Sequence, residues 1–253
     1  MRNILPVALL CAVLMPLPAA LASEKPFRVT LRGDAFADGV WTTGVQIELD
    51  DGWKTYWRMP GDAGIPPQFT WTTSVPADVS VSYPVPDRFV DASGEAVGYK
   101  HMVVFPVEVK AGDATAVTLD LDLFFAVCRE VCIPADAKAS INLGNAMRDP
   151  EGSLSVREWQ ARIPGSGTPV SGASIDATGP KPVLKLTLRE AAGDIFVETG
   201  TSAYFRAPQF SADGLEADLE IDNVKDVAKL KGTVLTVTDV TGGKGLEQQV
   251  TLP

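Results

Sequence analysis

Two cysteines separated by three residues, Cys128 and Cys132, are the part of this sequence best suited to chemistry. A third cysteine, Cys11, lies in an apolar leader at the amino terminus. A close thiol pair can form a disulfide that exchanges with other thiols, hold a soft metal ion, or staple a fold. A bond between Cys128 and Cys132 would close a loop of five residues, which contributes only about 2 kcal/mol to stability. The pair is therefore better suited to exchange than to holding a chain of this size together.

The residues around the pair favour exchange but differ from those of a thioredoxin site. Arg129 supplies a positive charge that favours a thiolate, and Pro134 stiffens the chain where it leaves the loop. Thioredoxin-like sites place CxxC at the start of a helix in a βαβ unit, whereas this CxxxC follows a strand-like run. If the pair exchanges, the nucleophile is expected to be the more exposed of the two thiols.

Two other interpretations of the pair stay open. A copper(I)-binding or copper-tolerance protein would use Cys128 and Cys132 together with His101, the single histidine of the chain. A β-sandwich binding protein would need the pair only as a structural disulfide. Disulfide exchange itself requires no cofactor.

Residues 1–22 have the pattern of a cleaved signal peptide. Arg2 precedes a mostly apolar run that ends in the small-x-small site Ala-Leu-Ala. No later apolar stretch is long enough to cross a bilayer, so we expect a periplasmic protein with no stable membrane insertion. The formal net charge of −10 repels phosphate backbones and argues against nucleic acid as a partner.

Short runs of alternating apolar and polar residues, bounded by Gly, Pro and Asp, predict half-buried strands along the chain. In the first half the clearest runs are 27–31, 43–49, 79–83, 103–109 and 117–123. In the second half they are 183–188, 195–198, 215–221, 234–238 and 249–252. Both halves are therefore predicted to be antiparallel β-sandwiches, which makes the chain all-β.

A helix and a linker are predicted between these two β domains. A helical pattern over 151–163, with Ser153 or Ser155 as its cap, precedes a stretch rich in Pro, Gly, Ser and Thr. The expected boundaries are 23–150 for the domain that carries the cysteines, 151–172 for the helix and linker, and 173–253 for the second, smaller β-sandwich.

Three segments of the sequence together carry a family resemblance. They are residues 52–67 (GWKTYWRMPGDAGIPP), residues 83–89 leading on to Gly98 and Tyr99, and residues 127–134 (VCREVCIP). This combination resembles the amino-terminal periplasmic domain of the DsbD/ScsB thiol:disulfide interchange family, here as a stand-alone secreted protein. The resemblance implies an immunoglobulin-like β-sandwich that passes reducing equivalents to periplasmic disulfide proteins.

The resemblance also implies roles for individual residues. Cys128 and Cys132 match the redox pair of the family, which cycles between disulfide and dithiol. In the DsbD form a loop with an aromatic tip caps the pair, and residues 89–95 lie in the corresponding place, so Phe89 is the first candidate for the cap and Tyr99 the second.

Tyr56 and Trp57, from the first of the three segments, are further candidates for capping or for docking a partner. The resemblance implies periplasmic thioredoxin-like or disulfide isomerase proteins as partners. Longer members of the family continue into a membrane electron conduit and a thioredoxin-like domain. This sequence supplies neither, so a separate membrane electron-transfer protein is the expected electron donor.

Overall fold

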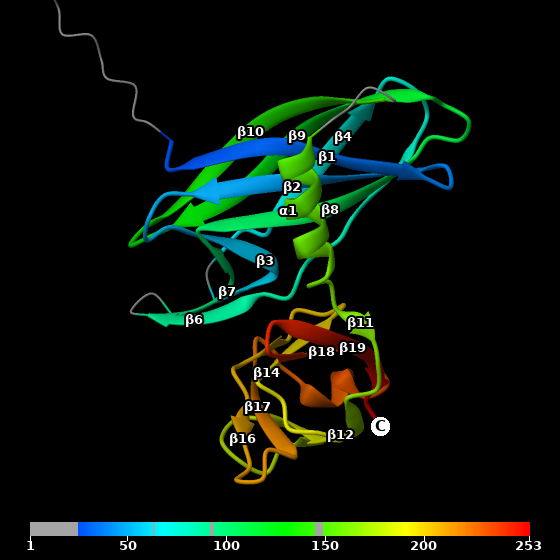
Figure 1. Ribbon diagram of the computed structural model, residues 1–253. Coiled ribbons are helices and arrows are strands. Elements are labelled where there is room, and N and C mark those ends of the chain that lie inside the picture. Colours follow the sequence, from blue (N-terminus) through cyan, green and yellow to red (C-terminus); the bar gives the residue numbers. More distant parts are fainter. Residues whose placement is uncertain (1–24, 63, 92–93, 145–148) are drawn as a thin grey trace, which may run out of the picture.

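The computed structural model is built almost wholly from β-strands (Figure 1) and describes residues 25–62, 64–91, 94–144 and 149–253. The predicted signal peptide, residues 1–22, lies outside the described residues. Among the residues that are described, no helix is long and apolar enough to cross a membrane. Two large hydrophobic clusters, one in each half of the chain, confirm the predicted all-β fold with two β domains.

Two antiparallel sheets pack face to face in the first domain, as in an immunoglobulin-like sandwich. One sheet contains, in spatial order, β1 (Phe27–Ala37), β2 (Val40–Leu49), β8 (Met102–Lys110) and β5 (Asp78–Val81). The other contains β10 (Cys132–Gly144), β9 (Ala116–Cys128), β3 (Lys54–Gly61), β7 (Gly94–Lys100) and β6 (Asp87–Asp91), and β4 (Gln68–Thr73) also pairs with β9. This order places the end of β9 beside β3 and β10, with β6 and β7 next along the sheet.

The core of the first domain follows the alternation seen in the sequence. Along β9, Val117, Leu119, Leu123 and Phe125 point inward and are buried, while polar side chains alternate with them. Residues of the facing sheet, including Phe105, complete the same cluster. The runs predicted from the sequence are therefore strands because one face of each covers this core.

The helix α1 (Pro150–Gln160) begins earlier than predicted, and the proposed serine caps are wrong. Asp149 is the N-cap, and its side chain accepts a hydrogen bond from the backbone N–H of Gly152. Ser153 and Ser155 lie inside the helix. Aspartate is among the best capping residues, and the proline that follows it suits the first helical position because its missing N–H would have no partner there.

The helix is part of the first domain rather than a simple connector. It packs on β1 and β8, where Val156 and Trp159 join the core. After the helix, β11 (Gly165–Ser166) pairs in parallel with β19 (Lys244–Thr251). The Gly- and Pro-rich stretch thus forms backbone hydrogen bonds with the second domain soon after the helix ends.

The second domain is also made of two packed sheets. The first contains β11, β19, β18 (Val234–Thr241) and β14 (Asp194–Thr199). The second contains β12 (Val170–Asp176), β13 (Val183–Leu188), β17 (Glu216–Asp222) and β15 (Tyr204–Phe205), and β16 (Gln209–Phe210) pairs with β17. A short 3-10 helix, η1 (Val227–Leu230), precedes β18.

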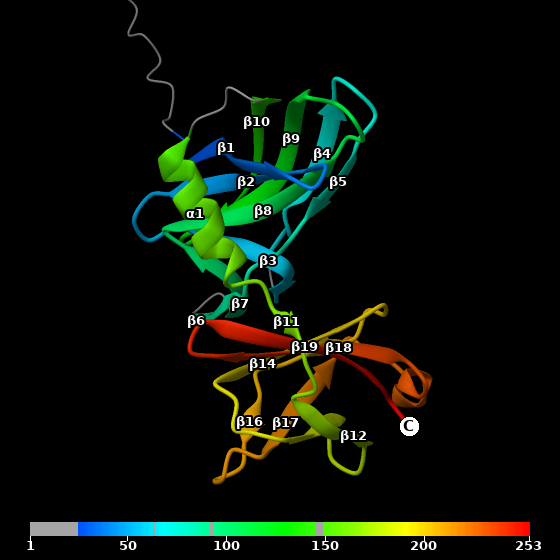
Figure 2. The ribbon, with the colours of Figure 1, turned by 45° about the vertical axis from the view of Figure 1, so that its right-hand side comes forward.

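The two domains pack against each other below β3, β6 and β7 (Figures 1 and 2). Phe196 of β14 lies in the core cluster of the first domain, and its ring centroid is 5.5 Å from that of Trp57. Arg58 forms ion pairs with Glu198 and Glu247 of the second domain. Burial alone would lower the pKa of Arg58, but these two carboxylates outweigh it and raise the pKa.

Candidate functional site

Cys128 and Cys132 form a disulfide across the end of the β9–β10 hairpin. Cys128 is the last residue of β9 and Cys132 the first of β10, and the two are direct partners in the antiparallel register. A loop of three residues joins them, closed by a hydrogen bond from the N–H of Arg129 to the carbonyl oxygen of Val131 at 3.4 Å. The disulfide is therefore held at the rim of the sandwich by two strands that continue into its core.

The two sulfur-bearing residues differ in their access to solvent. Cys128 is only 2% exposed and belongs to a small buried cluster, whereas Cys132 is an exposed residue. Two large apolar side chains beside Cys132 are also exposed, Val131 at 70% and Ile133 at 45%. An incoming thiol can therefore approach Cys132 across an apolar surface, while Cys128 lies behind it.

Tyr56 contacts the exposed cysteine from β3, which lies on the other side of β9 from β10. Its hydroxyl oxygen lies 3.2 Å from the sulfur of Cys132, and the tyrosine is 1% exposed. Tyr56 is on β3, which pairs with β9 so that Lys54 and Cys128 are direct partners. A tyrosine hydroxyl at this distance can donate a hydrogen bond to a thiolate and so favour the charged form of the thiol.

Two glycines make room for this tyrosine. A Cβ atom on Gly64 would lie 2.5 to 2.8 Å from three atoms of the Tyr56 ring. Gly98 is the register partner of Tyr56, and a Cβ there would lie 2.8 Å from the Tyr56 Cα and overlap the backbone oxygen of Thr55. A side chain at either position would collide with Tyr56 or with its strand, so both positions require glycine.

Phe89 is part of the surroundings of the buried cysteine. It is half-buried and packs on the small cluster formed by Tyr56, Ala96, Ala126 and Cys128. The ammonium group of Lys100 lies 4.2 Å from the centre of the Phe89 ring. Phe89 is thus located at the cluster that contains the buried cysteine.

The aromatic candidate for the cap is on a strand, not at the tip of a loop. Phe89 is in the middle of β6, which pairs with β7 as a hairpin, and its register partner is Ala96. Residues 92–93, which were expected to belong to the capping loop, lie outside the described residues.

Trp57 and Tyr99 lie in the core instead of at the disulfide. Trp57 is fully buried and contacts Phe196. The Tyr99 hydroxyl donates a hydrogen bond to the carbonyl oxygen of Pro84 at 2.7 Å, and burial raises the pKa of Tyr99 well above its usual value. Neither side chain presents a surface to a docking protein.

The residues of the copper interpretation do not come together around the cysteines. His101 is in the turn between β7 and β8, has a positive φ of 62°, and its nearest charged neighbour is Asp51 at 3.9 Å. Within the described part of the chain, no group of three or more His, Cys, Asp and Glu residues is arranged to hold a metal ion.

Arg129, the first residue of the loop between the two cysteines, extends over the ring of Trp53, 5.7 Å from its centre.

Sequence reasoning missed the residues that surround the cysteines on β3 and β7. Lys54 is the register partner of Cys128 and is only 4% exposed. Gly64 and Gly98 were both within the segments that suggested the family, but a glycine alone does not reveal which side chain it accommodates. The only signal available was their position close to several aromatic residues.

Comparison with known proteins identifies the family. A family model of the N-terminal domain of the thiol:disulfide interchange protein DsbD matches residues 17–143, half of the chain, including both cysteines. The chain belongs to the DsbD N-terminal domain family. None of the curated proteins matches the chain.

A solved structure extends the likeness beyond the DsbD N-terminal domain. The crystal structure of the N-terminal periplasmic domain of ScsB from Proteus mirabilis is similar to this chain, with a TM-score of 0.72 and 25% sequence identity. The match covers 94% of this chain and 96% of the other. The second β domain is therefore shared with that structure, as is the one that carries the disulfide.

Proposed function

We propose that this protein is a periplasmic thiol:disulfide exchange module. It accepts reducing equivalents from a membrane electron-transfer protein and passes them to periplasmic thioredoxin-like or disulfide isomerase proteins through Cys128 and Cys132. The observation that carries the proposal is a disulfide with one buried and one exposed cysteine, in a chain of the DsbD N-terminal domain family. The similar domain of ScsB is a periplasmic one, which supports the location.

Reduction of the pair begins at the exposed sulfur. A thiolate of the donor attacks the sulfur of Cys132, the Cys128–Cys132 bond breaks, and Cys128 leaves as a thiolate. A second thiolate of the donor then attacks its own sulfur in the mixed disulfide and releases Cys132. The donor is left oxidised to a disulfide, and the pair has gained two electrons.

Transfer to the acceptor reverses these steps. The thiolate of Cys132 attacks a disulfide of the acceptor protein and displaces one of its sulfurs as a thiolate. Cys128 then attacks Cys132 in the mixed disulfide, which restores the internal bond and releases the acceptor as a dithiol. Tyr56 assists the first of these steps because its hydroxyl, 3.2 Å from the Cys132 sulfur, stabilises the attacking thiolate.

Phe89 controls access in this scheme. Its ring packs on the cluster around Cys128, so it restricts access to the buried sulfur and leaves Cys132 as the sulfur that a partner thiol attacks. The exposed apolar side chains of Val131 and Ile133 form the surface on which a partner docks.

Trapping tests the proposal directly. Cys128→Ser leaves Cys132 free and should form a stable mixed disulfide with a thioredoxin-like protein whose second active-site cysteine is replaced by serine and whose remaining cysteine carries a thionitrobenzoate leaving group, because neither protein then has a second thiol to resolve the bond. Cys132→Ser leaves only the buried Cys128 and should form the same complex much more slowly. Equal trapping by the two variants would contradict the assignment of Cys132, and no trapping by either would contradict the exchange function.

Copper(I) titration separates the other interpretation. The exchange function predicts that added copper(I) leaves the redox equilibrium of the pair unchanged. Submicromolar copper(I) binding that is lost in Cys128→Ser would instead favour the copper-binding interpretation.

A further inference from the structure

The β6–β7 hairpin has two faces that contact different parts of the molecule. Successive residues of a strand point to opposite sides, and residues paired across an antiparallel ladder point to the same side. Phe89 and its partner Ala96 face the disulfide cluster. Arg88 and Glu95, each one residue away, therefore face the other side, where the second domain lies (Figure 2).

Arg88 ties β6 to the second domain. Its guanidinium donates hydrogen bonds to the carboxylate of Asp194 at 2.9 and 3.0 Å and to the carbonyl oxygen of Ile195 at 2.9 Å. It also lies over the ring of Phe196, 4.6 Å from the centre. Burial alone would lower the pKa of Arg88, but Asp194 and Glu95 outweigh it and raise the pKa, so the arginine stays charged.

Glu95 ties β7 to the same domain and is 8% exposed. It forms an ion pair with Arg88 across the hairpin. It also accepts a hydrogen bond from the Tyr204 hydroxyl at 2.8 Å and one from the backbone N–H of Ala207 at 3.2 Å. Burial and the neighbouring Glu95 raise the pKa of Tyr204, so Tyr204 stays a protonated donor.

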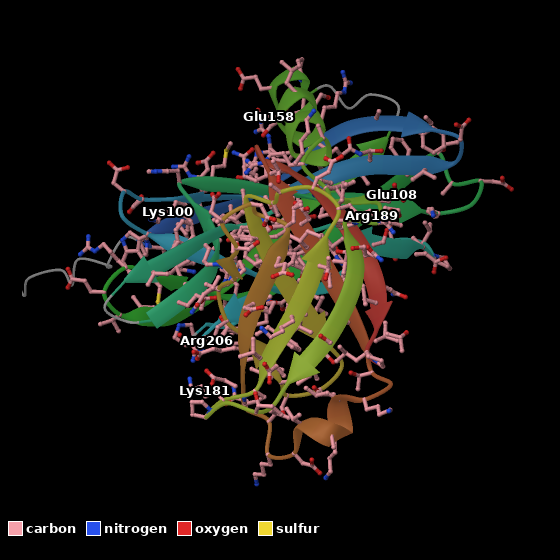
Figure 3. The ribbon with its side chains drawn as sticks, turned by 90° about the horizontal axis from the view of Figure 1, so that it is seen from below. Lys100, Glu108, Glu158, Lys181, Arg189 and Arg206 are labelled. Atoms are coloured by element: carbon pink, nitrogen blue, oxygen red, sulfur yellow. A yellow bond between two sulfur atoms is a disulfide. The ribbon has the colours of Figure 1, made fainter. Side chains whose placement is uncertain are left out.

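A third connection holds the turn end of the hairpin through Asp62. The Asp62 side chain accepts a hydrogen bond from the backbone N–H of Glu95 at 2.9 Å and forms an ion pair with Arg206 of the second domain. Arg206 and Lys181 each form an ion pair with Asp222. Figure 3 shows Arg206 and Lys181 close together on the second domain. The side chains of Arg88, Glu95 and Asp62 are thus all bound by residues of the second domain.

We infer that the second domain is a clamp on the β6–β7 hairpin: by holding Arg88 and Glu95 it keeps Phe89 packed on the cluster around Cys128, a role that rests on the exchange function proposed above. Arg88 and Glu95 are positioning residues, since they touch neither sulfur and act through the strand that carries Phe89. Binding of a partner at the disulfide must then either strain these contacts or loosen them. The second domain thereby keeps the Cys128 side of the disulfide covered.

The test measures how fast a small phosphine reductant opens the disulfide in the full chain. The clamp variant combines Asp194→Asn with Tyr204→Phe, which weakens two contacts of the second domain with the hairpin and leaves the first domain unchanged. The reduction rate should rise about tenfold, equivalent to about 1.4 kcal/mol. The reduction potential should stay the same, because the clamp restrains the oxidised and the reduced pair alike.

Glu198→Gln is the matched control. It weakens another charged contact between the domains, the one with Arg58 on β3, and does not touch the hairpin. Its reduction rate should stay within about twofold of that of the unmodified protein. If the double variant does not fold, Tyr204→Phe alone removes a single hydroxyl and should still raise the rate.

A double-mutant cycle with Phe89→Ala separates a clamp from a general loosening of the fold. Once the Phe89 side chain is absent, the clamp variant should add no further acceleration. Independent acceleration by the two changes, or a clamp variant that reacts at the unmodified rate, would overturn the inference. Because a phosphine needs no protein partner, failure to exchange with thioredoxin-like proteins would contradict the proposed function and leave this result intact.

Discussion

Replacing Tyr56 by phenylalanine should raise the pKa of the Cys132 thiol. The change removes only the hydroxyl, whose oxygen lies 3.2 Å from the Cys132 sulfur. A hydrogen bond to an anion favours the anionic form, so the unmodified protein should have the lower thiol pKa. Losing the bond makes the thiolate less stable and proton loss less favourable.

The size of the effect follows from the energy of a charged hydrogen bond. Such a bond contributes about 1.5–3 kcal/mol, and one pKa unit corresponds to about 1.4 kcal/mol. Because Cys132 is exposed, water partly replaces the lost donor, so the lower end applies and the rise should be about 1 pKa unit. At a pH above the pKa of this thiol, the reduced pair is destabilised by the same amount, which should lower its reduction potential by about 30 mV.

The assay uses residues 23–253 with Cys128→Ser as the background, so that Cys132 is the only thiol present. Its pKa is read from the pH dependence of alkylation by iodoacetamide, with and without Tyr56→Phe. Tyr99→Phe is the matched control, because it also removes a buried tyrosine hydroxyl, one bonded to Pro84. A shift below about half a pKa unit for Tyr56→Phe, or an equal shift for Tyr99→Phe, would refute the role of Tyr56.

Three further predictions concern the residues around the pair. In reduced single-cysteine variants, Cys132 should react with iodoacetamide at least about tenfold faster than Cys128, because Cys128 is buried; equal rates would contradict this. Gly98→Ala should lower the free energy of unfolding by about 1–3 kcal/mol in urea, because its Cβ overlaps the backbone of β3, whereas Gly200→Ala, with open space around it, should change little. Phe89→Ala should cost about 2 kcal/mol in the same assay and speed reduction by a phosphine, and an unchanged reduction rate would show that Phe89 shields nothing.

The strands with strong alternation, β9 among them, could be predicted from the sequence, while β3, β7 and β10 beside the site could not. β9 alternates large apolar with polar residues, because one of its faces covers the core. β3 and β7 are buried on both faces over much of their length and show no such period. β10 does alternate, but its inward positions are mainly alanines, which are weak strand formers.

The site was predictable in its chemistry but not in its surroundings. Spacing and context were enough to select Cys128 and Cys132, and the family resemblance placed Phe89 near them. Among the four aromatic candidates, only the pairing of β3 with β9 shows why Tyr56 reaches the sulfur while Trp57, the next residue, points into the core. The direction of a side chain depends on strand register, which the sequence does not reveal when the strand itself is not predicted.

The contacts between the domains were likewise beyond sequence reasoning. Glu95 was one acidic residue among many in an acidic chain, and such residues are usually solvated. It is buried because Arg88, Tyr204 and the backbone of Ala207, up to 112 residues away, surround its carboxylate. Only the tertiary arrangement of the two domains brings these groups together.

The reduction potential of the Cys128–Cys132 pair tests the central claim most directly. It can be measured by equilibrating the purified protein with glutathione or dithiothreitol buffers of defined ratio and trapping the free thiols. An exchange module should have a potential above about −300 mV, within reach of thioredoxin-like partners. A potential below that value would place the bond among structural disulfides and contradict the exchange function.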